Sequence, residues 1–404
     1  MDDRTIVCPY YGSCGGCSYP HDTYFKDGID RKEKDLLSLF SNLLEANSNV
    51  HPLIPCSQPK NFRNKMEFSF SDTLSGERYL GLLSLGQPKR TLNIDSCLLA
   101  DRAIIRCLQI TRNWWDQNPK IRSYYAPKNK GSLCSLTVRK SPSTQELMVI
   151  LTTSGNPQYT LNEKTILSLV EDLKNGAPLT SFIWRKKYAR KGVPTSYIQS
   201  CLYGKDYIII DVDLPETSIK HKFVVKPDAF FQPNNLQFSN LFKTILTLAE
   251  LRKDQVLFDL FCGSGTIGIM LAPFVKQVIG VELNKDAVCS ANMNLVINRI
   301  ESMTVEQNDV KSFIRGSSLK PDVLILDPPR SGLQSKIIKY LLRFDAPKII
   351  YVSCNPKTQF ADCRELVDAG YRITAMQPID QFPYSPHLEN IAVLQKDSSV
   401  TLNN

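Results

Sequence analysis

The chain has 404 residues, so we expect two or three domains rather than a single hydrophobic core. Hydrophobic residues make up 42% and charged residues 22%, as in soluble proteins, and no apolar run is long enough to cross a bilayer. The net charge of +9 is compatible with a polyanionic partner, but a mildly basic enzyme without such a partner would have the same charge.

The first residues, from Met1 to Cys8, lack the charged and then apolar pattern of a signal peptide, and we therefore expect a cytoplasmic protein. Twelve cysteines in that reducing compartment indicate that a few of them bind a metal or take part in catalysis. The others need no special role, because a free cysteine packs well as a small hydrophobic side chain.

Residues 1–27 show neither helical nor strand periodicity. They contain the spacing C-x5-C-x2-C, formed by Cys8, Cys14 and Cys17. Three thiols this close, with glycines that allow a tight wrap, suit an iron–sulfur cluster or a zinc ion. Either group needs a fourth ligand, for which we choose Cys97, with Cys56 and Cys107 as the nearest rivals. Three structural thiols without a metal are the remaining interpretation.

The next elements are a helix and a series of short strands. Leucines and a phenylalanine on one side predict a helix at about 31–46. Short apolar segments cut by Gly, Pro and Ser then predict a largely antiparallel β-rich domain. Its expected strands are 65–70, 134–139, 147–152, 181–184 and 207–212. We therefore place a cluster-binding segment with its helix at residues 1–60. Residues 61–225 would form a central β-rich RNA-binding domain, which contributes Cys97 to the cluster.

Two basic segments of the central domain are candidates for RNA contact. Arg63, Asn64 and Lys65 precede its first strand, and residues 183–191 interleave cations with aromatic side chains. Phosphate contact combined with base stacking would use such a pattern. A solvated hairpin face could have the same composition, so both interpretations stay open.

After Phe230 strands and helices alternate, which predicts a parallel sheet with helices on both faces. The expected strands are 256–260, 278–281, 323–326 and 349–352, and a final pair at 371–377 and 391–395. The expected helices are 266–272, 285–298, 334–342 and 357–369. The fold class is therefore α/β, with a Rossmann-like catalytic domain at 226–404.

The first strand of this domain leads into a glycine turn that is typical of nucleotide sites. Gly263, Gly265 and Gly268 form the pattern G-x-G-x-x-G, which favours dinucleotides and S-adenosylmethionine equally. Glu282 ends the second strand, where a carboxylate can accept hydrogen bonds from two ribose hydroxyls. Asp309 follows the third strand, where an adenine ring would lie.

The fourth and fifth strands carry the residues that point to a reaction. The fourth ends in Asp-Pro-Pro-Arg at 327–330, similar to a motif of methyltransferases that act on nucleobases. The fifth delivers Cys354 to the edge where open α/β sheets bind ligands. A thiolate that adds to carbon 6 of a uracil activates carbon 5 for methylation, after which a base must remove the carbon 5 proton. Glu389 is the best candidate for that base, and His387 could orient it.

The motifs D-L-F-C-G-x-G, D-P-P-R, S-C-N-P and F-P-x-x-x-H-x-E occur in this order, preceded by F-F-Q-P-N at 230–234. Over residues 230–395 the chain resembles the RNA (uracil-5-)-methyltransferase family. The resemblance implies S-adenosylmethionine as the cofactor, Cys354 as the nucleophile and Glu389 as the base. It also implies that the cofactor or the uracil is held by Gln232, Phe261, Glu282 and Asp327, with Thr266 at a less regular cofactor-contacting position.

The N-terminal cysteines resemble those of the 23S rRNA branch of that family. The resemblance implies a [4Fe–4S] cluster on Cys8, Cys14, Cys17 and Cys97, with 23S rRNA as the partner. Some family members begin with a β-barrel RNA-binding domain, which we expect to be missing here. We also expect a monomer.

Four alternatives remain. A tRNA uracil-5 enzyme is the nearest, and the N-terminal cysteines argue against it. Cytosine-5 enzymes also use a cysteine, but they typically carry Pro-Cys or Thr-Cys-Ser in place of the motifs at Asp327 and Cys354. A catalytically inactive RNA-binding factor would not need both Cys354 and Glu389. A nicotinamide-dependent reductase fits the glycine turn but has no use for that pair.

Overall fold

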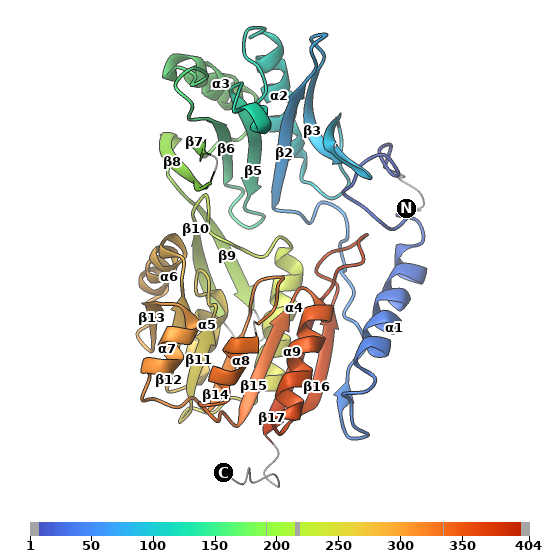
Figure 1. Ribbon diagram of the computed structural model, residues 1–404, viewed down its shortest axis with the longest axis vertical. Helices are drawn as coiled ribbons and strands as arrows, with labels where there is room; N and C mark the ends of the chain where they lie inside the picture. Colours follow the sequence, from blue (N-terminus) through green and yellow to red (C-terminus); the bar gives the residue numbers. More distant parts are fainter. Residues whose placement is uncertain (1–7, 191, 215–218, 334, 397–404) are drawn as a thin grey trace. The chain divides into compact units, whose positions relative to one another are not determined.

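The computed structural model describes residues 8–190, 192–214, 219–333 and 335–396. The described residues form two compact units (Figure 1). The first unit is made of residues within 1–22, 58–210 and 225–227. The second is made of residues within 23–57, 211–224 and 228–404. No helix in the described ranges has both the length and the apolarity needed to cross a membrane.

The first unit is built on a seven-stranded sheet in the order β4-β3-β2-β5-β6-β7-β8. Only β6 and β7 pair in parallel, and the other neighbours are antiparallel. The strands are β2 (Lys65–Asp72), β3 (Arg78–Ser84), β4 (Gln87–Asn93), β5 (Leu133–Lys140), β6 (Leu147–Ser154), β7 (Ser181–Arg190) and β8 (Val193–Gly204). The helices are α2 (Arg102–Asp116) and α3 (Glu163–Gly176), with a short 3-10 turn at Ala126–Lys128.

One face of this sheet packs against α2 and α3. Alternate residues of β2, Met66, Phe68 and Phe70, enter a core that also contains Trp114 and Trp115 of α2. The helix begins where the sequence supplies a cap, because the Asp101 carboxylate accepts a hydrogen bond from the Ala103 N–H at 2.8 Å. This central region is therefore a mainly antiparallel domain, as expected.

Three strands of this unit, β3, β4 and β8, were not among those expected from the sequence. Of these, β4 and β8 occupy the two edges of the sheet, and both contain a proline, Pro88 and Pro194. Proline cannot donate a ladder hydrogen bond and is tolerated on an edge strand. Nearly all of β8 is exposed, so it lacks the alternation by which half-buried strands are recognised.

The second unit contains an eight-stranded sheet in the order β1-β16-β17-β15-β14-β11-β12-β13. The strands are β1 (Asn49–Val50), β11 (Val256–Leu260), β12 (Gln277–Glu282), β13 (Met303–Gln307), β14 (Val323–Leu326), β15 (Lys348–Ser353), β16 (Tyr371–Ile379) and β17 (Glu389–Lys396). From β13 to β15 all neighbours are parallel, whereas β17 is antiparallel to both β15 and β16. The parallel part has the 3-2-1-4-5 order of a nucleotide-binding doubly wound fold.

The helices of this unit lie between its strands along the chain. They are α1 (Ile29–Phe40), α4 (Asn235–Ala249), α5 (Thr266–Leu271), α6 (Lys285–Ile297), α7 (Val310–Gly316), α8 (Ser335–Leu341) and α9 (Pro356–Asp368). A π-helical turn, η1 (Tyr24–Gly28), precedes α1, and a 3-10 turn, η4 (Ala272–Phe274), follows α5. The mixed α/β class and the alternating order predicted for this region are therefore confirmed.

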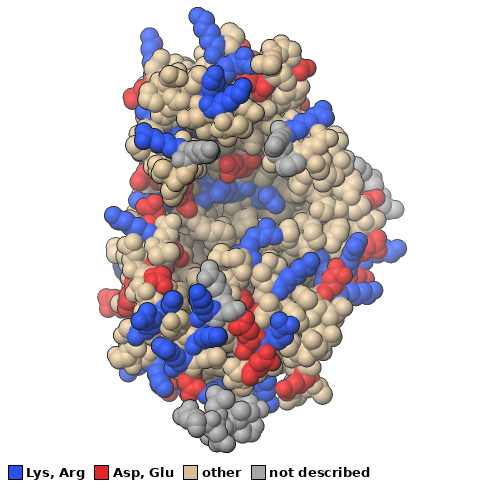
Figure 2. All heavy atoms as spheres, in the orientation of Figure 1, with Lys and Arg blue, Asp and Glu red and all other residues tan. Residues whose placement is uncertain are grey.

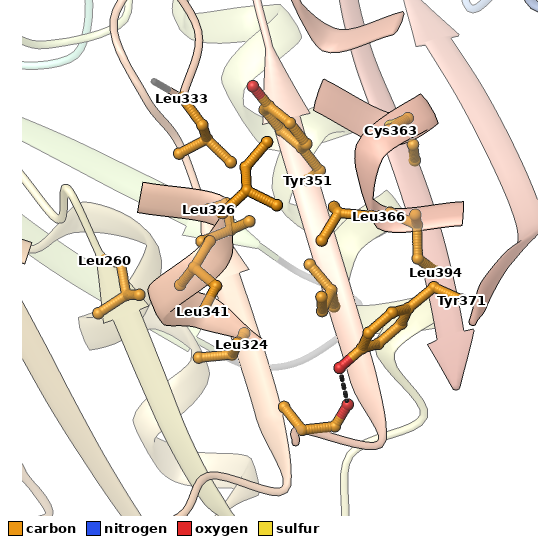
Figure 3. Packing of buried hydrophobic residues seen from close by; sticks show 14 of the residues in the cluster. Leu260, Leu324, Leu326, Leu333, Leu341, Tyr351, Cys363, Leu366, Tyr371 and Leu394 are labelled. Atoms are coloured by element: carbon orange, nitrogen blue, oxygen red, sulfur yellow. Dashed lines mark hydrogen bonds between the residues drawn. The ribbon is translucent and has the colours of Figure 1, made fainter. Parts of the chain in front are cut away.

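Apolar side chains from α8, α9 and the central strands form the core of this unit (Figure 3). Leu324, Leu326 and Tyr351 project from adjacent strands toward Leu341 and Leu366 of the two helices. The continuous apolar runs of β14 and β15 follow from burial on both faces. This rigid sheet fixes the edge at which the candidate catalytic residues lie.

The domain boundaries differ from the expected ones at the N-terminus. Residues 23–57 belong to the second unit rather than to a cluster-binding segment at 1–60. The physical reason is that α1 buries Leu36 and Phe40 in the core of the second unit, while β1 adds to its sheet beside β16. The strands β9 (Ile208–Leu214) and β10 (Ile219–Val225) form a separate two-stranded ribbon, divided between the units.

Candidate active site

The candidate catalytic residues lie at one edge of the parallel sheet. Asp327 directly follows β14, and Cys354 directly follows β15. Because β17 runs antiparallel to β15, its first residue, Glu389, lies at the end where β15 finishes. Ser353 is paired with Asn390, which makes Cys354 and Glu389 the next residues along the same ladder. The two residues predicted as nucleophile and base are thus brought together by strand register.

The charges around Cys354 hold its thiol in the neutral form. Burial, then the Glu389 and Asp327 carboxylates, raise the pKa of Cys354 to about 11, against a smaller lowering by Arg330. Burial and the nearby Asp327 raise the pKa of Glu389 well above its ordinary value. Burial raises the pKa of Asp327 to about 7. Each carboxylate therefore opposes ionisation of the others and of the thiol.

A glutamine of α9 joins the two strands that carry this pair. The side-chain amide of Gln359 donates to the Tyr351 carbonyl at 2.9 Å and to the Asn390 carbonyl at 3.1 Å. Asn390 in turn donates to the side-chain oxygen of Gln359 at 2.8 Å. All three contacts are buried, so Gln359 fixes the spacing of the strand ends beside Cys354 and Glu389.

Arg330 and His387 lie at the rim of the site. The Arg330 guanidinium is 3.1 Å from Nδ1 of His387, and both side chains are exposed. The Arg330 carbonyl accepts a hydrogen bond from the Asn355 amide at 2.9 Å, which ties the Asp-Pro-Pro-Arg turn to the residue after Cys354. His387 therefore contacts Arg330, and its expected role in orienting Glu389 remains a hypothesis.

The glycine turn after β11 forms a cradle of backbone N–H groups. Phe261, Gly263 and Gly265 have positive φ angles of 65°, 55° and 76°. Glu282 accepts hydrogen bonds from the N–H of Gly263 at 3.0 Å and of Asn284 at 2.7 Å. The carboxylate predicted to bind ribose hydroxyls is therefore held against the turn by the backbone.

Gly268 allows helix α5 to approach the strand closely. A Cβ at this position would lie 2.7 Å from Met303 and 2.8 Å from the Asp259 carboxylate. The Gly268 N–H donates to Oδ2 of Asp259 at 2.9 Å. The third glycine of the pattern thus serves packing, while the first two shape the turn.

Asp259 is a buried carboxylate that the sequence analysis did not single out as a site residue. Its Oδ1 atom has no hydrogen-bond partner among the described residues. Burial raises its pKa to about 8, with further raising by Asp327 and Glu282. A buried carboxylate whose pKa is raised by two neighbouring carboxylates favours a cationic ligand. Asp259 opens the D-L-F-C-G-x-G motif, and its orphan oxygen is the observation that indicates a ligand.

The remaining predicted cofactor residues differ in their surroundings. Asp309 caps α7, because its carboxylate accepts from the Ser312 N–H at 3.1 Å. Hydrogen bonds from the Ser312 side chain and then from its backbone N–H lower the pKa of Asp309. Thr266 is half-buried at the first position of α5. Asp309 thus has a structural role that does not require a cofactor.

Gln232 contacts the loop that leads to Glu389. Its side-chain oxygen accepts a hydrogen bond from the Gln381 amide at 2.8 Å, and both side chains are buried. The side-chain oxygen of Gln381 has no hydrogen-bond partner in the part of the chain that the structure describes. Gln381 was not predicted as a site residue, although it directly precedes the Phe-Pro motif. The pair leaves one buried acceptor available to a ligand.

The N-terminal cysteines share a cavity in the first unit. That cavity is lined by Cys8, Cys14, Cys17 and Cys97, together with Arg63. Burial and then the thiols of Cys97, Cys8 and Cys14 raise the pKa of Cys17 to about 12. The Gly16 N–H donates to the sulfur of Cys14 at 3.3 Å. Neither rival for the fourth position lines this cavity, since Cys107 is buried in α2 and Cys56 contacts Asn234.

The four thiols are not arranged as the ligands of a single metal ion. All twelve cysteines are described and carry free thiols. Within the described ranges, no three His, Cys, Asp or Glu side chains are grouped closely enough to hold a metal ion. The iron–sulfur motif predicted from the sequence is therefore not shown, and only the common cavity of the four cysteines is established.

On the face that Figure 2 shows, Lys and Arg side chains are interspersed with Asp and Glu. The distribution of charge on this face does not by itself identify an RNA-binding surface, so any RNA contact must be argued from particular elements.

Known proteins agree with the chemistry of this site. The family described as tRNA (Uracil-5-)-methyltransferase matches residues 193–397. An "Uncharacterized RNA methyltransferase" of Chlamydia pneumoniae is 46% identical over 394 residues, covering 96% of this chain and 98% of the relative. A similarly described protein of Clostridium tetani is 34% identical, over 97% of this chain and 84% of the relative.

A solved structure extends the similarity to nearly the whole chain. It is the Pyrococcus abyssi tRNA (uracil-54, C5)-methyltransferase in complex with S-adenosyl-L-homocysteine, with a TM-score of 0.72 and 26% identity. The match covers 94% of this chain and 86% of that one. The chain therefore belongs to the tRNA (uracil-5-)-methyltransferase family and is an S-adenosylmethionine-dependent RNA methyltransferase.

Proposed function

We propose that this enzyme methylates carbon 5 of a specific uridine in 23S rRNA and produces 5-methyluridine. The observation that carries the proposal is the pairing of Cys354 with Glu389 at the ends of two hydrogen-bonded strands, beside Asp327. A thiol and a carboxylate in this arrangement suit a reaction that begins with nucleophilic addition and ends with proton removal. A catalytically inactive RNA-binding protein would have no need for such a pair.

In the proposed mechanism Cys354 adds as a thiolate to carbon 6 of the uracil, and the electron pair displaced from the double bond makes carbon 5 nucleophilic. S-adenosylmethionine supplies an electrophilic methyl group when it is bound. Glu389 then removes the carbon 5 proton, the double bond re-forms and the thiolate leaves carbon 6. The raised pKa of Glu389 makes its ionised form a stronger base than an ordinary carboxylate.

The residues around the glycine turn fit the cofactor. S-adenosylmethionine carries a positive sulfonium and an α-amino group, and the orphan oxygen of Asp259 together with Asp327 offers negative charge to such groups. Glu282 would bind the ribose hydroxyls, and Gly263 and Gly265 leave room for the cofactor. Phe261, Thr266, Gln232 and Asp309 complete the proposed site, with Asp309 the least supported because it caps α7.

We further propose a [4Fe–4S] cluster on Cys8, Cys14, Cys17 and Cys97. Their common cavity and the neighbouring Arg63 support it, because four thiolates need compensating positive charge. In a cubane cluster each thiolate binds a different iron atom, so the four sulfurs need not converge on one point as they would around zinc. Zinc remains the alternative metal.

A comparison of 5-methyluridine in 23S rRNA and in tRNA tests which RNA the enzyme methylates. The N-terminal cysteines support 23S rRNA, whereas the Pyrococcus abyssi structure is that of a tRNA enzyme. Mapping of 5-methyluridine in both RNAs from a strain without this gene should reveal one unmethylated uridine in 23S rRNA and unchanged tRNA. A loss in tRNA alone would replace the proposal with the tRNA enzyme, and no loss in either RNA would reject both.

A further inference from the structure

The two faces of the seven-stranded sheet in the first unit differ in chemistry. The face covered by α2 and α3 is apolar and includes Phe182 and Trp184 of β7. The opposite face is mixed, and its centre is buried, including Met148 and Ile150 of β6 and Ile183 of β7. Its accessible part lies toward the β8 edge, where Arg185 and Lys187 of β7 are half-buried and β8 is nearly all exposed. This edge of the sheet, rather than the whole face, can contact a ligand.

The basic run of β7 is divided between these two faces. Successive side chains of a strand point to opposite sides, so Lys186 follows Phe182 and Trp184 on the helix-covered face. Its ammonium lies 4.0 Å from the centre of the Trp184 ring. Tyr188 also points this way and packs on Gly155, where a Cβ would be 2.6 Å from the tyrosine ring. Half of the run therefore belongs to the packing of the unit itself.

The other half of the run lies beside two tyrosine rings, of which Tyr124 is half-buried and Tyr197 is exposed. Lys187 is paired across the strands with Tyr197 of β8 and lies 5.3 Å from the centre of the Tyr124 ring. The Arg185 guanidinium lies 5.6 Å from the centre of the Tyr197 ring, which is 49% exposed. On one side of the β7–β8 hairpin, the two cations Arg185 and Lys187 therefore lie beside one exposed ring, that of Tyr197.

This combination of cations with an exposed ring matches the chemistry of single-stranded RNA. Cations bind phosphates, and exposed rings on a sheet stack on bases that are not paired. A duplex would offer phosphates but no free base faces. We propose that Arg185, Lys187 and Tyr197 bind a single-stranded segment of the RNA substrate, a surface we call the hairpin platform. The inference rests on the proposed function only in taking RNA as the substrate.

The test uses matched neighbours on the two faces. Binding of the full-length protein to a fluorescent single-stranded uridine-rich oligonucleotide is measured by anisotropy at several salt concentrations. Lys187→Gln should weaken binding and reduce the slope of log affinity against log salt by about one. Lys186→Gln, which removes the same charge from the adjacent residue, should leave the slope unchanged. Thermal melting checks that each variant is folded.

Tyrosines provide an independent test of stacking. Tyr197→Leu should weaken binding of the oligonucleotide by roughly ten-fold without changing the salt slope. Tyr203→Leu is the control, because Tyr203 pairs with Phe182 and lies 5.3 Å from Lys174 of α3, on the helix-covered face. A duplex of the same length should show little dependence on Tyr197.

Three outcomes would overturn the hairpin platform. Equal losses in Lys186→Gln and Lys187→Gln would mean diffuse charge rather than one binding face. Unchanged binding in Lys187→Gln and Tyr197→Leu would mean no RNA contact there. A changed oligomeric state in Tyr197→Leu, seen by light scattering, would assign the face to a protein contact. Methyl transfer by the wild type is assayed separately, so loss of the platform and failure of the proposed function are distinguishable.

Discussion

At the scale of single residues, the site places acidic side chains around a thiol that the proposed mechanism requires as a thiolate. Burial and then Glu389 and Asp327 raise the pKa of Cys354, whereas Arg330 and a backbone hydrogen bond lower it. At neutral pH the free enzyme therefore holds little thiolate. A positively charged cofactor would favour ionisation of all three acids, which couples cofactor binding to activation of the nucleophile.

The reactivity of Cys354 toward iodoacetamide measures this balance. With a pKa of about 11, its labelling rate should rise steadily from pH 7 to pH 10 without a plateau. Asp327→Asn removes a like charge and should raise the rate at each pH, because the thiol pKa falls. Arg330→Gln removes the opposing cation and should lower the rate.

The labelled peptide that contains Cys354 is quantified by mass spectrometry, so the other cysteines do not interfere. Cys354→Ala identifies any background in that peptide. A plateau of the wild-type rate below pH 9, or slower labelling in Asp327→Asn, would contradict the charge assignment.

Two of the residues at this site show the limit of sequence reasoning. Cys354 and Glu389 could be predicted because each follows or begins a strand in a recognisable motif. Asp259 opens the D-L-F-C-G-x-G motif and Gln381 directly precedes the Phe-Pro motif, but neither was assigned a role. What distinguishes them is a buried oxygen without a partner among the described residues, a property that depends on tertiary packing.

At the scale of elements, helix α1 holds the loop that leads to Glu389. The Lys32 ammonium donates to the Asp380 carboxylate at 2.6 Å and to the Phe382 carbonyl at 3.0 Å, and both charged side chains are fully buried. The Tyr24 ring packs against Tyr384 with centres 4.6 Å apart. This N-terminal segment therefore fixes the loop from one side, while Gln232 contacts it through Gln381.

Breaking the buried ion pair tests this bracing role. Lys32→Met should lower the free energy of unfolding by about 3–5 kcal/mol, because it leaves the Asp380 carboxylate buried without its partner. The double variant Lys32→Met with Asp380→Leu should recover most of that loss, since it removes both charges. Urea unfolding of the three proteins measures these differences. A single variant as stable as the wild type would show that the pair does not brace the loop.

The predictability of the elements follows their burial. The strands β11, β14 and β15 were predicted almost residue by residue, because burial on both faces requires continuous apolar runs. The edge strands β4 and β8 were missed for the opposite reason. The placement of α1 was also wrong, because an amphipathic helix identifies its apolar face but not the core that receives it.

At the scale of the whole molecule, each unit is built from separate segments of the chain. Residues 23–57 belong to the second unit, although the segments before and after them belong to the first. The cysteines at 8–17 and Cys97 are far apart in sequence but line one cavity of the first unit. A cluster bound to them would therefore join two distant segments of chain. Because the segments of the two units alternate along the chain, the contiguous domain boundaries expected from the sequence did not match the structure.

Removal of single cysteines tests the proposed cluster. Anaerobically purified protein should be brown and contain about four irons and four sulfides per chain. Cys97→Ser should lose iron and colour, whereas Cys107→Ser, a change in a cysteine that does not line the cavity, should keep both. Colourless wild-type protein with one stoichiometric zinc would contradict the cluster.

The central claim is that Cys354 attacks the uracil and Glu389 later removes its carbon 5 proton. The most direct measurement incubates Glu389→Gln with RNA and S-adenosylmethionine labelled in the methyl group, followed by denaturing electrophoresis. Addition and methylation precede proton removal, so labelled RNA should remain covalently bound to the protein, while turnover falls by several orders of magnitude. Cys354→Ala should form no adduct and no product. Methylation by Cys354→Ala, or normal turnover by Glu389→Gln, would contradict the account.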